Sequence, residues 1–276
     1  MEYLVSVIIT SFNAEKFIYQ AVKSILNQTY ENFECHFVDD GSQDRTVEII
    51  QDVHDPRIRI HQPGRLGRGR ALNYGIKQSH GELIAIQDAD DVSHPRRLEL
   101  QVQTMIQQPE ISTLGSDQRI ISARDASLSN LSDPESRKIQ VNCVKRSLIF
   151  FNPIPHTSLM VRRTALEKVS GYDESRSNLF DWDLLIRLCE AGHPPYKYLL
   201  PLVYKRIHNE QFFEKKRRLY YVKSCLKLQR TAISKLGRNP VLLAPLAGLF
   251  LYRLLPHKLR ITARRCYGAM VCQNGG

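Results

Sequence analysis

Residues 82–91 read ELIAIQDADD, an apolar run that leads directly into three carboxylates. The run over residues 82–87 is typical of a strand buried within a sheet. Asp88, Asp90 and Asp91 follow where this strand ends, and adjacent carboxylates repel one another unless a cation is present. The stretch therefore predicts either a site for Mn²⁺ or Mg²⁺, or a solvated turn that caps the next helix.

The sequence before this stretch repeats the same order of buried strand and helix. Strands are expected at 4–10, 33–38 and 57–61, and helices at 14–28, after Ser42 and at 71–79, with Asn13 and Ser42 as N-caps. Because strands and helices alternate about every 25 residues, we predict an α/β fold with a doubly wound, mostly parallel sheet. Ligands of such sheets bind beyond the carboxyl ends of the strands.

The second half of the chain is less regular. Residues 122–137 are polar and Ser-rich, which predicts a long loop. Helices are predicted near 164–169 and 180–191, and a basic amphipathic helix over 212–236.

Charge is distributed unevenly along the 276 residues. The net charge is +11, yet residues 205–276 hold 16 Lys and Arg against 2 Asp and Glu, and the remainder holds 23 against 26. The chain is thus a near-neutral body with a basic tail, and its 42% hydrophobic content excludes global disorder.

The cysteines and apolar runs point to the cytoplasm. The six cysteines form no CxxC pair and fit reduced thiols. The N-terminal stretch MEYLVSVIIT lacks a basic region and is predicted to be a strand rather than a signal peptide. The longest apolar run, residues 241–255, is broken by Pro245 and Arg253 and is shorter than the roughly 18 residues of a membrane span.

Other carboxylates each allow two interpretations. Asp39 and Asp40 follow the second strand, where they either form a turn or bind an NH group or ribose hydroxyl of a ligand. Asp181 and Asp183 point to different sides of a helix, so one is a candidate general base, or both simply favour the helix N-terminus.

The arginines of the segment 64–70 alternate with glycines. Such a segment can bind phosphate, although surface arginines are the simpler explanation and no P-loop GKS/T follows.

Ordered motifs across about residues 1–210 resemble glycosyltransferase family 2, whose members are nucleotide-sugar-dependent enzymes with a GT-A fold. The stretches that carry the resemblance are VSVIITSFN at 5–13, VDDGS at 38–42, GRALNYGI at 69–76, QDADD at 87–91 with PRRL at 95–98, GYDE at 171–174 with DWDL at 181–184, and RIH at 206–208. No single motif is decisive, but six in the family's order are a strong signal.

The resemblance implies roles for individual residues. The implied donor-binding residues are Thr10, Asp39, Asp40, Arg68, Arg70 and Asp88. Of these, the first three would contact a uracil base and Asp88 the ribose or the donor sugar. Asp90, with His208, would hold Mn²⁺ or Mg²⁺ at the diphosphate. Asp181 would be the general base of a hexosyltransferase that inverts the anomeric centre.

One departure from the family pattern lies beside that base. Phe180 stands where the family usually has Glu. This substitution implies a lost contact or an unusual acceptor, and it motivates an alternative hypothesis, a non-catalytic nucleotide-binding scaffold.

The resemblance also divides the chain into domains. Residues 1–210 are expected to be a GT-A catalytic domain, with a nucleotide-sugar-binding half at 1–110 and an acceptor-side half at 111–210. Residues 211–276 are expected to form a basic helical C-terminal extension, which packs on the body, binds an anionic membrane surface or binds nucleic acid. We favour the membrane, and expect no nucleic-acid partner because no recognised motif is present. A peripheral enzyme on the inner face of the cell membrane, extending a glycan or lipid-linked acceptor of a surface polysaccharide, would fit this arrangement.

Overall fold

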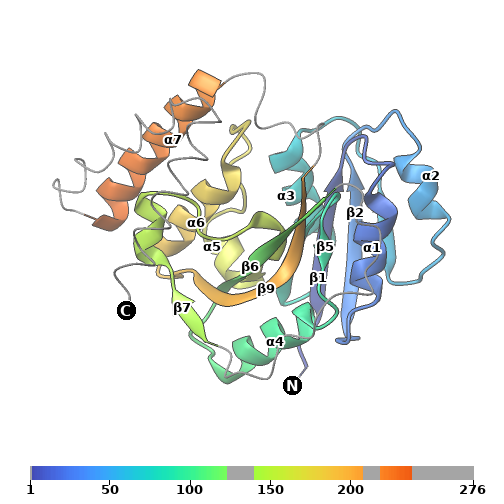
Figure 1. Cartoon of the computed structure of the whole chain (residues 1–276), viewed down its shortest axis with the longest axis horizontal. Helices are drawn as coiled ribbons and strands as arrows, with labels where there is room; N and C mark the ends of the chain where they lie inside the picture. Colours follow the sequence, from blue (N-terminus) through green and yellow to red (C-terminus); the bar gives the residue numbers. More distant parts are fainter. Residues whose placement is uncertain (1, 123–139, 208–217, 238–276) are drawn as a thin grey trace. The chain divides into compact units, whose positions relative to one another are not determined.

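The computed structural model describes residues 2–122, 140–207 and 218–237 (Figure 1). The chain divides into two compact units, Met1–Gln211 and Phe212–Gly276. His208, the predicted loop beyond residue 122 and the apolar run 241–255 lie outside the described residues.

The first half of the larger unit is a parallel sheet. Strand β1 (Val5–Ser11) lies between β2 (Phe33–Asp39) and β4 (Leu83–Asp88), and β3 (Ile58–His61) pairs with β2 at the edge. All three pairings are parallel, as the alternation of strands and helices predicted.

The second half continues the same sheet with mixed pairing. Strand β8 (Met160–Arg162) pairs antiparallel with both β4 and β6 (Thr113–Ser122), and β6 pairs parallel with β9 (Tyr196–Ile207). Short strands β5 (Val92–Ser93) and β7 (Val141–Cys143) pair with β9. The order in the described part of the chain is β3-β2-β1-β4-β8-β6-β9-β5, with β7 beside β9.

Helices cover this sheet, as Figure 1 shows for α1 and α3 on opposite sides of β1 and β2. The helices are α1 (Ile18–Leu26), α2 (Thr46–Gln51), α3 (Arg68–Gln78), α4 (Arg97–Gln107), α5 (Arg163–Lys168) and α6 (Phe180–Glu190), with 3-10 turns η2 (Lys145–Ile149) and η3 (His156–Ser158). This is the α/β architecture expected from the sequence.

Packing of α1 and α3 fixes the central strands. Val7 and Ile9 of β1 belong to one buried cluster with the apolar side of α1. On the opposite face α3 lies very close, because a Cβ on Gly75 would be 2.8 Å from Cγ2 of Ile8. Glycine at this position lets the helix approach the strand, and the approach brings the first turn of α3 to the carboxyl end of the sheet.

Two local expectations are wrong. Asn13 does not cap α1, which begins at Ile18; its side-chain oxygen accepts a hydrogen bond from Gln43 N instead. Ser42 does not cap α2, because its hydroxyl accepts from Asn13 N. These two residues tie the loops after β1 and β2 together across the sheet edge.

Helix α3 also begins earlier than expected, at Arg68 rather than near residue 71. Gly67 precedes it with a φ of 87°, a conformation that glycine adopts without penalty. Arg68 and Arg70 are therefore held on the first turn of a helix rather than in a loop.

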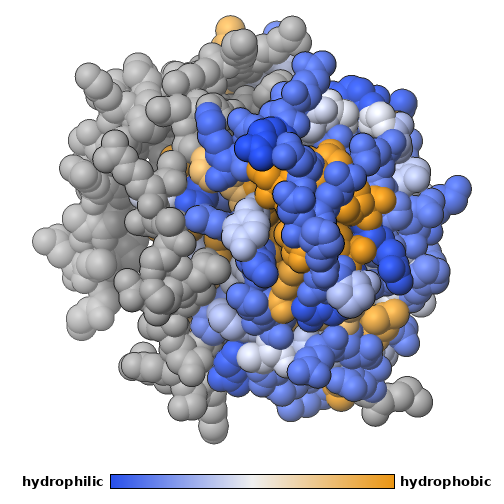
Figure 2. All heavy atoms as spheres, turned by 90° about the vertical axis from the view of Figure 1, so that its right-hand side faces the viewer, coloured by the Kyte–Doolittle hydropathy of each residue, from blue (hydrophilic) through white to orange (hydrophobic). Residues whose placement is uncertain are grey.

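Figure 2 views the molecule from the side of α1 and α2 and shows a largely hydrophilic surface interrupted by an apolar patch. Over the described residues, large apolar side chains that remain exposed include Phe12 and Tyr19.

The smaller unit is described only over residues 218–237. Helix α7 (Arg218–Ala232) lies within the predicted basic helix and continues into a π-helical turn, Ile233–Gly237, which reaches the last described residue. Among the described residues, no helix combines the length and the apolar character that a membrane crossing requires.

Candidate active site

The carboxyl ends of the three central strands lie level with one another. Thr10 of β1 is directly opposite Val38 of β2 and Asp88 of β4. The predicted Asp39–Asp40 and Asp88–Asp91 segments therefore meet at one edge of the sheet, where ligands of this fold class bind.

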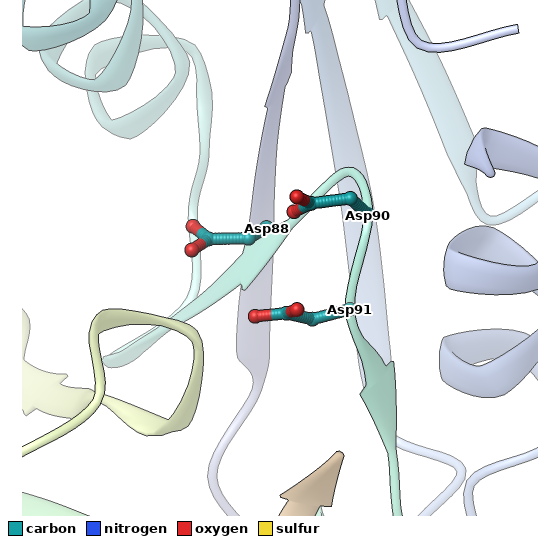
Figure 3. A group of neighbouring side chains, drawn as sticks. All are labelled: Asp88, Asp90 and Asp91. Atoms are coloured by element: carbon teal, nitrogen blue, oxygen red, sulfur yellow. The ribbon is translucent and has the colours of Figure 1, made fainter. Parts of the chain in front are cut away.

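Asp88, Asp90 and Asp91 form an acidic cluster, with ligand atoms that all lie within 4.8 Å of one another. Figure 3 shows the three side chains extending to the same side of the loop that joins β4 to β5. Burial, together with the charges of Asp88 and Asp90, raises the pKa of Asp91 well above its usual value. Three carboxylates that resist sharing a site fit a hard divalent cation, because such an ion binds oxygen ligands and removes the repulsion.

Asp88 also contacts two side chains from distant segments. Its Oδ1 accepts a hydrogen bond from Nη2 of Arg68 and lies 3.3 Å from Nδ1 of His156. Burial opposes ionisation of Asp88, but the charge of Arg68 and the contact with His156 outweigh it and lower the pKa of this carboxyl far below its usual value. Asp88 is therefore an ionised residue held by two basic groups.

An aromatic cluster lies beside Arg68. The centroid of the Phe180 ring is 5.4 Å from the guanidinium carbon of Arg68. The same ring packs edge-on against His156 and Tyr172. The Tyr172 hydroxyl is 2.9 Å from Nε2 of His156. Phe180 is 5% exposed, so the residue that departs from the family pattern is a buried packing element next to the Arg68–Asp88 pair.

Arg206, at the end of β9, forms hydrogen bonds with the loop that carries the acidic cluster. Its backbone N donates to Oδ1 of Asp91 over 2.9 Å, and its Nε donates to the carbonyl of Asp90 over 3.1 Å. The side chain is 1% exposed and also reaches Gln20 on α1.

Asp39 and Asp40 lie at the end of β2 and are both buried. Oδ2 of Asp39 accepts hydrogen bonds from the backbone of Gly41 and Ser42, which is the turn expected for this segment. Its other oxygen, Oδ1, is buried and accepts no hydrogen bond from the described residues. A buried acceptor without a partner is unfavourable and suits a ligand NH group.

The carboxylate of Asp40 accepts hydrogen bonds from other residues of the protein. Its Oδ1 accepts from the backbone N of Leu66 and Gly67, and its Oδ2 from Nη1 of Arg65. Arg65 in turn stacks on the exposed ring of Phe12, with 3.6 Å between the guanidinium carbon and the ring centroid. Asp40 thereby fixes the segment that leads into α3.

Asp181 and Asp183 face different surroundings, as their spacing predicted. Asp181 is half-buried in the first turn of α6, and its Oδ2 accepts a 2.7 Å hydrogen bond from the Asn152 amide. Asp183 is buried and forms ion pairs with Arg176 and Arg187. Only Asp181 is thus available to a ligand.

Asp181 and the acidic cluster both influence the charge of Arg68. Burial lowers the pKa of Arg68, but the charges of Asp88, Asp90 and Asp181 outweigh it and raise the pKa overall. Arg70, in contrast, is exposed and pairs with Glu174 at 3.6 Å. The structure therefore brings Asp181, Asp88, Asp90 and Arg68 together, while Arg70 lies with a different partner.

Comparison with known proteins identifies the family. The model of "Glycosyl transferase family 2" matches residues 6–170. The chain belongs to this family. A Haemophilus influenzae protein described as an uncharacterized glycosyltransferase is 30% identical over 221 residues, which cover 75% of this chain and 67% of that protein.

One relative is considerably longer than this chain. Chondroitin synthase of Escherichia coli is 28% identical over 249 residues, which cover 89% of this chain and 35% of that protein. The chain thus spans about a third of the length of this relative.

Solved structures agree on the fold. TarS of S. aureus in complex with UDP-GlcNAc superposes with a TM-score of 0.67 at 18% identity, covering 90% of this chain and 72% of that one. A mannosyltransferase from Pyrobaculum calidifontis in complex with GDP-Man and Mn2+ gives 0.61 at 18% identity, covering 100% and 77%. The GT-A architecture expected from the sequence motifs is confirmed.

Two residues of this site, Asn152 and His156, lie outside every motif of the sequence. Tyr172, Arg97 and Gln87 lie within the motifs GYDE, PRRL and QDADD, but the motifs imply no role for them. A histidine or an asparagine in an irregular segment carries no periodic signal, so its place beside Asp88 or Asp181 emerges only from tertiary packing. Arg206 lies within the motif RIH, but nothing in the motif indicates that it holds the acidic loop.

Proposed function

We propose that the protein is an inverting, metal-dependent glycosyltransferase that moves a sugar from a UDP-sugar to a glycan or lipid-linked acceptor. The observation that carries this proposal is the convergence, at one sheet edge, of a cluster of three carboxylates, the basic Arg68 and a separate carboxylate, Asp181. A transferase needs these two functions because the leaving diphosphate must be neutralised and the acceptor must lose a proton.

The donor would bind at the ends of β1, β2 and β4. Oδ1 of Asp39 offers a buried acceptor to a base NH such as that of uracil, and Thr10 lies on the neighbouring strand. Asp40 acts through the loop it holds, and Arg68 with Arg70 supplies charge-assisted hydrogen bonds to phosphate.

Asp90 would hold Mn²⁺ or Mg²⁺, with His208 as a further ligand. The ion, when bound, neutralises negative charge on the departing nucleoside diphosphate. Asp88, already ionised beside Arg68, is placed to contact the ribose or the donor sugar.

Asp181 would act as the general base. The Asn152 amide orients its carboxylate, leaving Oδ1 to accept the proton of the acceptor hydroxyl. As the O–H bond breaks, the acceptor oxygen forms a bond to the anomeric carbon and the nucleoside diphosphate leaves from the opposite face. One such displacement inverts the anomeric configuration.

Two measurements test the proposal. A panel of nucleotide-sugars, assayed for thermal stabilisation with and without Mn²⁺, should reveal a UDP-sugar that stabilises the protein more in the presence of the metal. With that donor, Asp181→Asn should bind normally yet transfer about 10²- to 10⁴-fold more slowly. Transfer at the wild-type rate would show that another residue is the base.

A non-catalytic scaffold remains the alternative, because Phe180 places an aromatic ring where the family usually has a carboxylate. This hypothesis predicts neither transfer nor donor hydrolysis by the wild-type protein with Mn²⁺ under conditions in which the donor binds.

We further propose that the enzyme works in surface polysaccharide synthesis at the inner face of the cell membrane. Support comes from the E. coli relative described as a chondroitin synthase and from the basic tail. The full chain should co-sediment with anionic vesicles at low salt and less at high salt, whereas preferential binding to duplex nucleic acid would contradict the membrane assignment.

A further inference from the structure

Arg97, the first residue of α4, is a completely buried arginine that the proposed reaction does not use. Burial lowers its pKa to about 9, although the negative charge of Asp88 acts in the opposite direction. A buried charge is costly unless its surroundings compensate for it. Within the described part of the chain its hydrogen bonds all go to neutral oxygens, so an ion pair does not explain its presence.

The guanidinium connects the segments that surround the acidic loop. Nη1 donates to Oε1 of Gln87 and to the hydroxyl of Ser93, at 3.2 and 2.9 Å. Nη2 donates to the carbonyl of Ile86 at 2.9 Å, and Nε to Oε1 of Gln101 at 3.2 Å. Ile86 and Gln87 precede the loop and Ser93 follows it, so one planar group spans both ends of the acidic segment.

Gln87 extends this connection into the loop itself. Its Oε1 accepts from Arg97 and from the Ser93 hydroxyl, while its Nε2 donates to the carbonyls of Asp88 and Asp91, at 3.0 and 2.9 Å. The side chain is 1% exposed, so water cannot easily replace these hydrogen bonds.

We propose that Arg97 and Gln87 are positioning residues that fix the backbone of residues 88–91 and thereby set the spacing of the three carboxylates. The proposal rests on the metal-dependent function proposed above. Its physical reason is that the carboxylates repel one another, and a loop without internal support would let them move apart before a cation binds. Groups that orient metal ligands typically change metal affinity by about 10- to 100-fold.

Gln87→Glu is the most informative variant. It keeps an oxygen for Arg97 and Ser93 but replaces the amide that donates to the two loop carbonyls. In a folded variant, added negative charge alone would strengthen Mn²⁺ binding, so weaker binding indicates lost positioning. Gln103→Glu is the matched control, because it makes the same chemical change at an exposed site on α4.

Mn²⁺ binding to the full chain without nucleotide, followed by electron paramagnetic resonance of the free ion, gives the readout. We expect Gln87→Glu to weaken binding about 10- to 100-fold and Gln103→Glu to leave it within about twofold. Equal binding by Gln87→Glu and wild type would overturn the proposal.

Arg97→Lys separates geometry from charge. Lysine retains the charge but cannot place donors on Gln87, Ser93, Ile86 and Gln101 simultaneously. Weakened binding by a folded Arg97→Lys variant supports the positioning role, and wild-type affinity contradicts it. If this variant does not fold, Gln87→Glu decides the question alone.

The same titrations distinguish this proposal from the proposed function. Wild-type protein that binds no Mn²⁺, or binds it as weakly as Asp90→Asn, overturns the metal assignment and this inference with it. Wild-type binding that Asp90→Asn removes but Gln87→Glu leaves unchanged overturns only the positioning role.

Discussion

Two strand ends of the same sheet carry similar aspartate-rich segments that the fold uses differently. At the end of β2, the carboxylates of Asp39 and Asp40 accept four backbone hydrogen bonds from nearby loops. At the end of β4, ligand atoms of the three clustered carboxylates lie within 4.8 Å of one another, and their partners are the side chains of Arg68 on α3 and His156 on η3 and the backbone N–H of Arg206 on β9. The first segment builds local structure, whereas the second concentrates charge.

The difference shows that an aspartate pair after a buried strand does not by itself indicate a site. Satisfied carboxylates stabilise a turn, while mutually repelling ones gain from a ligand. Oδ1 of Asp39 is the exception at the first strand end, because it is buried without a hydrogen-bond partner among the described residues. Each prediction below tests one side of this contrast.

Among variants at the two strand ends, Asp90→Asn should have the largest effect on activity and leave the fold intact. Removing a carboxylate that would hold the metal should cost several kcal/mol of transition-state stabilisation, or roughly 10³-fold in turnover. Transfer assays at saturating Mn²⁺, with a wild-type sample in EDTA for comparison, measure this loss. Activity near the wild-type level would contradict the proposed difference between the two strand ends, because the end of β4 would then not hold a metal that the reaction needs.

The parallel first half of the sheet was predictable from the sequence, whereas strands β6 to β9 and their mixed pairing were not. Buried strands such as residues 4–10 are continuous apolar runs, and their alternation with helices leaves few topologies open. Helix ends were less predictable. Asn13 and Ser42 look like N-caps, yet each instead bonds to the other strand's loop, a tertiary contact that local sequence does not encode.

The site was predictable only in part, for a similar reason. Motif order indicated Asp88, Asp90 and Asp181, whose surroundings in the structure are consistent with the roles proposed for them. Their supporting residues could not be predicted, because Asn152 comes from a loop and His156 from the short 3-10 turn η3, both far away in the chain. Asp40 illustrates the opposite case. Its sequence motif indicates a ligand-binding residue, whereas in the structure its carboxylate accepts hydrogen bonds from residues 65–67.

Asp40→Ala tests the structural role at the end of β2. It leaves the backbone N–H groups of Leu66 and Gly67 without their acceptor, so we expect a loss of about 3 kcal/mol in the free energy of unfolding. Denaturant titration measures it, and Asp90→Asn is the comparison, with a change below about 1 kcal/mol because a partly exposed carboxylate contributes little to stability. Equal stability of the two variants would contradict the assignment of Asp40.

Asp39→Asn should show the reverse pattern, a small change in stability and a larger one in donor binding. An amide retains one acceptor for the turn but cannot match a carboxylate at a base NH, and a charged hydrogen bond contributes about 1.5 to 3 kcal/mol. We therefore expect UDP affinity to fall by about tenfold or more by calorimetry. An unchanged affinity would show that the unpartnered Oδ1 does not face the nucleotide.

Gly41→Ala should produce the smallest effect and isolates the backbone of the same turn. Gly41 has a φ of 81°, where an L-residue is strained, and a new Cβ would lie 3.4 Å from the backbone N of Arg65. The strain should lower the free energy of unfolding by about 1 to 2 kcal/mol, while Mn²⁺ affinity should stay within about twofold, because the acidic cluster belongs to a different strand end. Gly64→Ala provides the matched control, because its φ of 83° imposes similar strain while an added Cβ meets nothing within 4 Å. Any larger loss of unfolding free energy in Gly41→Ala therefore measures the contact with the Arg65 loop. A change in Mn²⁺ affinity on Gly41→Ala would mean that the two strand ends are coupled, and that the segment from Asp40 through Arg65 to Arg68 transmits the strain to Asp88.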